Sequence, residues 1–346
     1  MRRVLLAATL SATIVLAGCG AGDGGTGGGG GESSSAASSA SVAPSPAEGQ
    51  VIASTIPAPS LAGNLLGDPA ERSIIVYLPP SYEGSDQRYP VVYFLAGADE
   101  SVGRLKPFSG PMWDEMARTG TEMILVEADG RNALGANFYA NSPVGGNAED
   151  VVADDLVAYV DQTYRTLADR SSRGLSGFSM GGSGTVNVGL RHPDVYAALY
   201  ACSPGLLAED GGLEAFLRSN GAWRAYGAAF APDVTVPSPF MRPIDAHAPL
   251  DGQDPAVVAA WESGFGNLRQ KIADYLGQTQ RLEEIRVVYG THDSYPWIPV
   301  GSDYFLGLLE ENGVPHSSQT FNGGHTLDSA GFAADYISFF SEHLKG

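Results

Sequence analysis

Cysteine is scarce in this chain of 346 residues, which holds only Cys19 and Cys202. If Cys19 carries a lipid, as its surroundings predict, the rest of the chain cannot form an intrachain disulfide. Basic residues are scarce too: 20 Lys and Arg stand against 39 Asp and Glu, a net charge of −19. That balance argues against nucleic-acid binding and against electrostatic docking on anionic lipid. Cys202 lies in the apolar stretch YAALYACS, which favours a buried, inert thiol.

The amino-terminal residues have the features of an export signal. Arg2 and Arg3 precede the apolar run 4–16, which is too short for a comfortable membrane span, and small residues follow up to Cys19. The ending Leu-Ala-Gly-Cys resembles a bacterial lipobox, which implies cleavage after residue 18 and lipidation of Cys19. The alternative is an ordinary signal peptide with a chance cysteine. We therefore expect a lipid-anchored protein of the bacterial cell envelope, facing the periplasm or the exterior.

Residues 19–48 are rich in Gly, Ser and Ala and hold almost nothing that could form a core, so they predict a flexible tether. The remaining residues, 49–346, suit one large α/β domain. Short apolar runs predict strands, and several are apolar on both faces, as in a covered parallel sheet. The predicted strands are 51–56, 73–78, 91–95, 123–128, 173–176, 197–202, 285–289 and 317–321. The predicted helices are 149–165, 182–193, 254–276, 303–312 and 330–344.

Strands that alternate with helices predict a mostly parallel, doubly wound sheet, with 51–56 as an antiparallel edge. Residues 205–283 interrupt this alternation and are rich in Gly, Pro, Trp and Phe. An insertion of this length predicts a cap or pocket wall, with a plain surface excursion as the alternative. Four aromatic residues are candidates for lining an acyl or aryl pocket, with ordinary packing as the alternative for each: Trp113, Phe138, Tyr139 and Trp297.

The segment 177–181 reads Gly-Phe-Ser-Met-Gly and fits the pattern G-x-S-x-G. Chance can supply such a match in a chain with 45 glycines, so its surroundings must decide. A short strand precedes Ser179 and a helix is predicted to follow near Gly181, which is the arrangement of a nucleophile elbow. A phosphate-binding loop is the alternative, but no Lys follows at the required spacing.

A serine nucleophile needs a base to remove its proton. His325 follows the last predicted strand through Asn322-Gly323-Gly324, and thus lies at the carboxyl end of the sheet. The other candidates are His192, His247, His292, His316 and His343. The base in turn needs an orienting carboxylate. Asp293 follows the strand 285–289 and is preferred to Asp303, which is predicted to begin and cap a helix.

Two backbone amides are predicted to form an oxyanion hole. One is the N–H of Met180, the residue after the nucleophile. The other is the N–H of Ala98, in the loop after 91–95, where Ala96-Gly97-Ala98 leave the backbone uncovered.

The motifs together resemble the esterase family of α/β-hydrolases that includes esterase D, enterochelin esterases, feruloyl esterases and mycolyltransferases. The resemblance covers roughly 71–345. It rests on RSIIVYLPPSY (72–82), RYPVVYFLAG (88–97), RGLSGFSMGG (173–182), RHPDVY (191–196), GTHD (290–293) and NGGH (322–325). It implies an α/β-hydrolase fold with Ser179 as nucleophile, Asp293 as acid, His325 as base, and Ala98 and Met180 as amide donors. The chain departs from its relatives at Ala96, where they often carry His or Asp.

We therefore predict a serine carboxylic ester hydrolase that acts through an acyl-enzyme and needs no metal or organic cofactor. Its substrate is expected to be a small-molecule or glycan-linked ester; feruloyl, acetyl-sugar, siderophore and simple acyl esters are all compatible with the sequence. Two alternatives stay open: acyl transfer to an alcohol, as mycolyltransferases catalyse, and a non-catalytic surface lipoprotein that binds a ligand on a hydrolase scaffold.

Overall fold

The computed structural model describes residues 48–328 and 330–346. These residues belong to the compact unit Pro44–Gly346. The predictions for the signal segment 1–18, for Cys19 and for nearly all of the tether 19–48 lie outside the described residues. Among the helices that are described, none is both long and apolar enough to cross a membrane.

Eight strands form one sheet in the order β1-β2-β4-β3-β7-β8-β9-β10. Strand β2 pairs antiparallel with β1 and with β4, and every other pairing is parallel. The expected mostly parallel sheet with an antiparallel edge is therefore confirmed. The strands are β1 Gln50–Pro57, β2 Glu71–Leu78, β3 Val91–Leu95, β4 Ile124–Ala128, β7 Arg173–Phe178, β8 Ala198–Cys202, β9 Glu284–Gly290 and β10 His316–Phe321.

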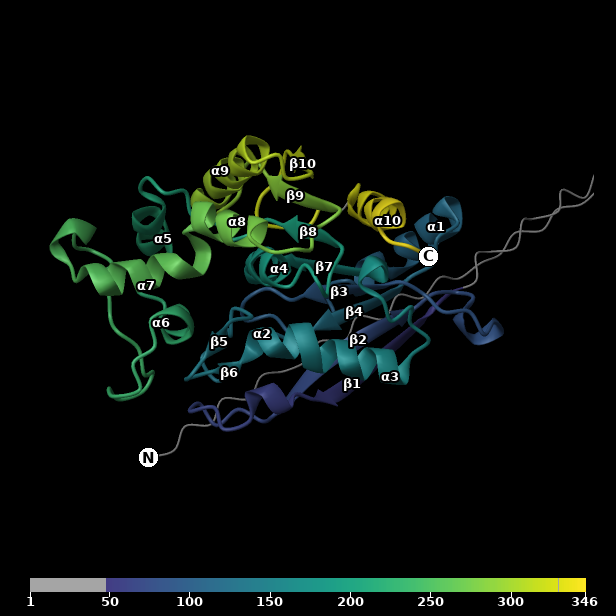
Figure 1. The fold of residues 1–346 in the computed structure, drawn as a ribbon, viewed down its shortest axis with the longest axis horizontal. Coiled ribbons are helices and arrows are strands. Elements are labelled where there is room, and N and C mark those ends of the chain that lie inside the picture. The colour runs from purple at the N-terminus through teal and green to yellow at the C-terminus, as the bar shows by residue number, and fades with distance from the viewer. Residues whose placement is uncertain (1–47, 329) are drawn as a thin grey trace, which may run out of the picture. The chain divides into compact units, whose positions relative to one another are not determined.

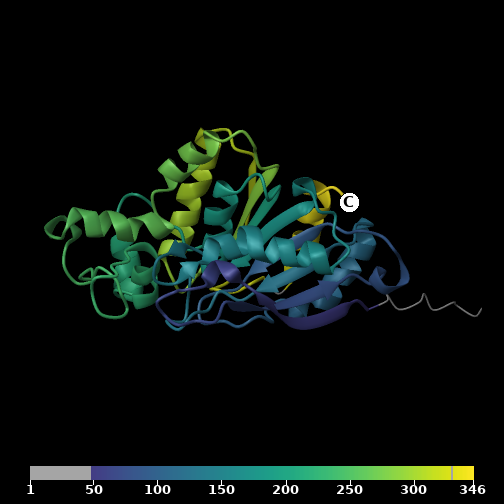
Figure 2. The same ribbon diagram turned by 60° about the horizontal axis from the view of Figure 1, so that its bottom comes forward.

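Helices cover both faces of the sheet (Figures 1 and 2). Successive strand residues point to opposite faces, so Tyr93 and Leu95 of β3 belong to one buried cluster and Val92 and Phe94 to the other. The second cluster is completed by helices α1 Ser109–Thr119 and α10 Phe332–His343. The first is completed by α3 Leu156–Thr163, α4 Met180–Arg191, α8 Leu268–Leu276 and α9 Trp297–Glu311.

The predicted insertion lies between β8 and β9 and contains α5 Gly212–Asn220, α6 Arg224–Phe230, α7 Pro255–Phe265 and α8. Helices α5, α6 and α7 lie together at one side of the sheet in both views (Figures 1 and 2). The single helix expected over 254–276 is wrong: α7 ends at Phe265, and Asn267, with a left-handed φ of 52°, separates it from α8.

Two smaller corrections concern the other helices. The helix expected over 149–165 consists of α2 Ala148–Asp150, a π-helical turn over Val151–Asp155, and α3. The helix expected over 303–312 begins earlier, at Trp297. Its start was predicted too late because no capping side chain marks it in the sequence. A short hairpin, β5 Asn141–Ser142 with β6 Gly146–Asn147, precedes α2.

Candidate active site

Ser179 occupies a strained turn between β7 and α4. Its φ of 57° and ψ of −115° are unfavourable for a residue with a side chain, and such strain costs about 1–3 kcal/mol. The neighbouring glycines allow the strand and the helix to meet: a Cβ on Gly181 would lie 1.9 Å from the Leu95 carbonyl oxygen, and one on Gly177 would lie 2.3 Å from the Gly181 carbonyl oxygen. The local geometry is that of a nucleophile elbow.

Ser179, His325 and Asp293 form one continuous chain of hydrogen bonds. His325 Nε2 lies 2.8 Å from Ser179 Oγ, and His325 Nδ1 lies 2.7 Å from Asp293 Oδ2. An ionised carboxylate can only accept, so Nδ1–H donates to Asp293, and Nε2 is free to accept the Ser179 hydroxyl proton. The Asp293 side chain is fully buried, while 15% of the His325 side chain is exposed. Three residues far apart in the sequence are thus arranged for proton transfer from the serine.

The loops that carry the acid and the histidine are bonded to each other. The His292 N–H donates to the Gly323 carbonyl at 2.9 Å, and the Thr291 N–H donates to the Phe321 carbonyl at 3.0 Å. Gly290 is required for this approach, because a Cβ there would lie 2.4 Å from the carbonyl oxygens of Gly323 and Gly324. The Tyr295 N–H then donates to Asp293 Oδ1 at 2.8 Å, which fixes the carboxylate.

The alternative acid lies elsewhere. Asp303 does not begin a helix as expected; it lies within α9, and its Oδ1 accepts a hydrogen bond from the Tyr289 hydroxyl. The other histidines also lie outside the cluster. His192 contacts Glu149, His292 contacts Thr291, and His316 and His343 contact main-chain carbonyls, while His247 is exposed.

The two predicted amide donors line the same cavity as Ser179. Met180 is the first residue of α4, where a helix leaves its N–H groups without intrahelical partners. Within the described residues, the Ala98 N–H has no hydrogen-bond acceptor. Polar groups of the two preceding residues do form hydrogen bonds. The Ala96 carbonyl accepts from the Tyr139 hydroxyl at 2.9 Å, and the Gly97 N–H donates to Glu100 Oε2 at 3.2 Å. Both amides are therefore available to a negatively charged oxygen.

A cavity of about 430 Å³ opens at the serine, and one of its walls is aromatic. Phe216, Trp223 and Phe265 come from the insertion, and Tyr295 and Trp297 come from the segment after β9. The rings pack on one another, with Phe265 and Trp297 stacked at 6.0 Å between centroids. Residues of the insertion thus line the cavity.

Only one of the four aromatic candidates lines this cavity. Trp297 does, whereas Phe138 lies behind the wall, with its ring 5.7 Å from that of Phe265. Tyr139 is buried beneath the Ala96 carbonyl. Trp113 lies in the core on the other face of the sheet. Sequence reasoning missed Phe216, Trp223 and Phe265, for which the aromatic composition of the insertion was the available signal, and it also missed Tyr295, which follows β9.

A polar side of the cavity was also missed. Asp99, Glu100 and Arg104, all from the loop after β3, line it. Burial lowers the pKa of Arg104, although the nearby Glu127 carboxylate opposes this shift. Cys202, by contrast, is buried with its thiol pKa raised by burial, so it is inert as expected.

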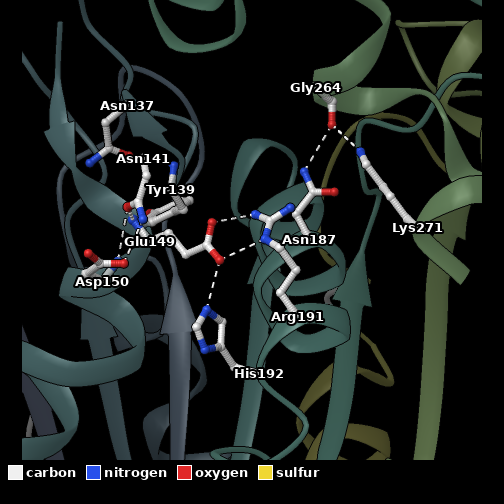
Figure 3. Close-up of polar contacts among 10 residues, drawn as sticks. All are labelled: Asn137, Tyr139, Asn141, Glu149, Asp150, Asn187, Arg191, His192, Gly264 and Lys271. Carbon is white, nitrogen blue, oxygen red and sulfur yellow. Dashed lines mark hydrogen bonds and ion pairs between the residues drawn. The ribbon is translucent and has the colours of Figure 1, made fainter. Parts of the chain in front are cut away.

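Polar contacts behind the aromatic wall attach the insertion to α4 (Figure 3). The Gly264 carbonyl accepts from Asn187 Nδ2 at 3.1 Å and from Lys271 Nζ at 2.6 Å. Burial lowers the pKa of Lys271 to about 7. Because Phe265 follows Gly264 directly, these two contacts fix the backbone at an aromatic residue of the wall.

At the carboxyl-terminal end of α4, about one turn beyond Asn187, Glu149 binds Arg191 and His192 (Figure 3). Burial acts to raise the pKa of Glu149, but hydrogen bonds with His192 and Arg191 outweigh it and lower that pKa. The same hydrogen bond with Glu149 raises the pKa of His192. His192 therefore has a structural partner far from the serine.

The fold is that of the α/β-hydrolases, and Ser179 lies at the position of the nucleophile elbow in that fold. The family model described as "Putative esterase" matches residues 69–300, more than half of the chain, and the protein belongs to this family. An esterase of Mycobacterium tuberculosis is 27% identical over 272 residues, which cover 75% of this chain and 54% of the relative. The chain thus spans about half the length of that relative.

Further similarities extend the comparison. A xylanase/feruloyl esterase of Xylanibacter ruminicola is 30% identical over 137 residues, 35% of this chain and 18% of the relative. Among solved structures, a ferulic acid esterase has a TM-score of 0.56 at 23% identity, covering 86% of this chain and 99% of its own. An S-formylglutathione hydrolase from Agrobacterium tumefaciens has a TM-score of 0.59 at 18% identity, covering 86% and 97%. These structural matches bear on the fold alone.

Proposed function

We propose that the protein is a carboxylic ester hydrolase that acts through an acyl-enzyme on Ser179. The observation that carries the proposal is the hydrogen-bonded chain from Ser179 Oγ through the His325 ring to the buried Asp293 carboxylate. A serine on a strained turn, a base and an orienting acid are the parts that acyl transfer needs. Membership of the esterase family supports the same reaction.

In the first half of the reaction, Ser179 Oγ attacks the ester carbonyl carbon while His325 Nε2 takes the hydroxyl proton. Asp293 stabilises the imidazolium that forms, and the Ala98 and Met180 N–H groups stabilise the negative oxygen. Collapse of the intermediate breaks the bond to the alcohol oxygen, which receives the proton from His325. Water then attacks the acyl carbon while His325 takes its proton. The bond between the acyl carbon and Ser179 Oγ breaks, His325 returns the proton to Ser179 Oγ, and the acid leaves.

The proposed substrate is an ester with an aromatic acyl group. The aromatic wall of the cavity supports this assignment, because rings pack well on rings, and a volume of about 430 Å³ accommodates such a group. The name of the xylanase/feruloyl esterase relative agrees with it. The alcohol would lie against the polar side of the cavity, which suits a hydroxyl-rich leaving group such as a sugar.

A panel of esters tests the proposal. The purified protein is expected to hydrolyse aromatic acyl esters of sugars with a higher kcat/KM than the corresponding acetyl esters. A competing alcohol separates hydrolysis from acyl transfer: free acid as the main product supports hydrolysis, and a new ester as the main product would make the protein a transferase. Binding of the esters without turnover would favour the non-catalytic alternative.

We also propose that the protein is lipid-anchored through Cys19 in the bacterial cell envelope. The proposal is supported by the sequence 1–19 alone. Two or more acyl chains on one cysteine anchor a protein stably, whereas a single chain binds marginally. Growth with a labelled fatty acid should label the wild-type protein and leave Cys19→Ser unlabelled; equal labelling of both would refute the anchor.

A further inference from the structure

The loop after β3 is held by a carboxylate from its own sequence. Glu100 Oε2 accepts a hydrogen bond from the Gly97 N–H at 3.2 Å. The Gly97 carbonyl and the Ala98 N–H belong to the next peptide unit, so fixing Gly97 limits how the Ala98 N–H can rotate. Glu100 therefore restrains the orientation of the Ala98 N–H, which in the proposed mechanism donates to the negatively charged oxygen.

Arg104 connects Glu100 to the nucleophile turn. Its Nε donates to Glu100 Oε2 at 2.9 Å, and its Nη2 contacts Glu100 Oε1, which makes the pair bidentate. The Arg104 guanidinium also lies 4.3 Å above the centroid of the Phe178 ring, a cation–π contact. Phe178 directly precedes Ser179, and its ring centroid lies 4.8 Å from that of His325.

The main chain at Arg104 is fixed independently by Glu127 of β4. Glu127 is fully buried, and it accepts from the Arg104 N–H at 2.7 Å, the Leu105 N–H at 3.3 Å and the Tyr77 hydroxyl at 3.0 Å. Arg104 is thus anchored to the sheet through its backbone, while its side chain reaches both the oxyanion loop and Phe178.

We propose, on the basis of the esterase function proposed above, that Glu100 and Arg104 are positioning residues that hold the Ala98 amide in line with Ser179. The Glu100–Arg104 ion pair connects the two halves of the oxyanion hole. Glu100 binds the loop that carries the Ala98 N–H, and Arg104 packs on Phe178, which begins the turn that carries the Met180 N–H. The pair acts on the transition state, since negative charge develops on the carbonyl oxygen only as the transition state and the tetrahedral intermediate form.

A role for Arg104 as a receptor for an anionic substrate fits the geometry less well. Its Nε and Nη2 are both engaged by Glu100, and Asp99 adds a second carboxylate to the same side of the cavity. That side therefore carries an excess of negative charge, which repels an anion. The contacts favour positioning over direct substrate binding.

The test uses Glu100→Ala and Glu100→Gln in the full-length protein. The Gln side chain keeps an oxygen that can accept from the Gly97 N–H but loses its charge. Removing an oxyanion donor outright costs about 100- to 1000-fold in kcat, so misplacing one should lower kcat about 10- to 100-fold in Glu100→Ala. We expect KM to change less than about 2-fold, and Glu100→Gln to recover part of kcat.

Glu115→Ala is the matched control, because Glu115 forms a similar bidentate pair with Arg118 on α1, away from the cavity. Glu115 is the more buried of the two carboxylates and also accepts a hydrogen bond from Ser338 Oγ at 2.6 Å, so Glu115→Ala should lower stability at least as much as Glu100→Ala does. Thermal unfolding monitors this directly. An equal loss of kcat in Glu115→Ala and Glu100→Ala would overturn the proposal, as would a raised KM with unchanged kcat, because that pattern means direct substrate binding.

A second measurement separates this proposal from the proposed function. The rate at which an aryl fluorophosphonate modifies Ser179 also depends on the oxyanion hole but requires no substrate. Glu100→Ala should slow this rate about 10-fold or more relative to Glu115→Ala. An unchanged rate refutes the positioning role even if the wild type hydrolyses esters; a slowed rate supports it even if no ester of the panel is hydrolysed.

Discussion

The loops at the carboxyl end of the sheet and the insertion between β8 and β9 contribute to one cavity in different ways. The loops after β7, β9 and β10 supply Ser179, Asp293 and His325, and backbone hydrogen bonds and glycine contacts leave them little freedom. The insertion supplies aromatic surface, and its Gly205 N–H donates to the Ser179 carbonyl at 3.4 Å, apart from the side-chain hydrogen bonds that join Ser179, His325 and Asp293. We therefore expect the strands of the sheet and the loops that follow them, here called the framework, to determine the rate of the reaction, and the insertion to determine which ester fits the cavity.

This separation predicts that the two regions can be altered independently. Replacing a side chain in the insertion should change the shape of the proposed acyl site and leave the proposed proton transfer intact. Replacing one in the framework loops should alter proton transfer for every substrate. Substitutions in the two regions should therefore differ in kind: framework changes lower kcat for all esters, and insertion changes alter the preference among esters.

The largest expected effect is at the acid. Asp293→Asn should lower kcat about 1000- to 10,000-fold for every ester, because an amide no longer holds the His325 ring in the tautomer that accepts the serine proton. Asp303→Asn is the matched control and should change kcat less than about 2-fold, since Asp303 contacts Tyr289 and not His325. Steady-state kinetics on both variants checks this. Comparable losses in the two would mean that Asp293 is not the acid.

A smaller effect is expected at the aromatic wall. Trp223→Ala should lower kcat/KM for an aromatic acyl ester about 3- to 10-fold, the amount that one lost aromatic contact costs, and should leave the acetyl ester nearly unchanged. Phe108→Ala is the control, because Phe108 is a partly buried ring that packs on Phe332 outside the cavity. The ratio of kcat/KM for the two esters is the measurement. An equal fall in kcat/KM for both esters would show that the aromatic wall does not select the acyl group.

The smallest expected effect is on the pH dependence of stability, and it concerns Lys271, which donates to the Gly264 carbonyl within the insertion. Burial lowers the folded-state pKa of Lys271 to about 7, below its ordinary value. Between about pH 7 and 10 the unfolded chain therefore binds more protons than the folded chain does. The free energy of unfolding of the wild type consequently rises as pH rises through that range. Lys271→Met removes this dependence. Its Tm should exceed that of the wild type by about 2–4 °C at pH 6, and the difference should shrink towards pH 10.

Lys106→Met, at an exposed position, serves as the control and should follow the wild type at all pH values. Thermal unfolding between pH 6 and 10 measures both variants. A difference between Lys271→Met and the wild type that does not vary with pH would show that Lys271 keeps its proton in the folded protein.

The framework could be predicted well because its signals in the sequence are local. Buried parallel strands are continuous apolar runs, and the residues that follow them must meet at one edge of the sheet. For this reason the amino-acid sequence alone suffices to place Ser179, Asp293 and His325 together. The prediction that Asp303 begins a helix was wrong, because α9 begins six residues earlier than expected, at Trp297, where no capping side chain marks its start.

The insertion and the polar side of the cavity could not be predicted in the same detail. Phe216, Trp223, Phe265 and Trp297 converge from separate segments, and no periodicity relates them. Phe138 and Trp297 were equally plausible from sequence, yet one lies behind the wall and the other forms it. The Glu100–Arg104 pair depends on where Glu127 holds the loop, and that contact joins residues more than 20 positions apart.

The identity of the nucleophile is tested most directly by intact-mass analysis after treatment with an aryl fluorophosphonate. The wild type should gain one phosphonyl group, located on Ser179 by peptide mapping, and lose all ester hydrolysis in proportion. Ser179→Ala should gain none and should retain no turnover of p-nitrophenyl esters above the uncatalysed rate. Stoichiometric modification of another residue, or full turnover by Ser179→Ala, would contradict the assignment.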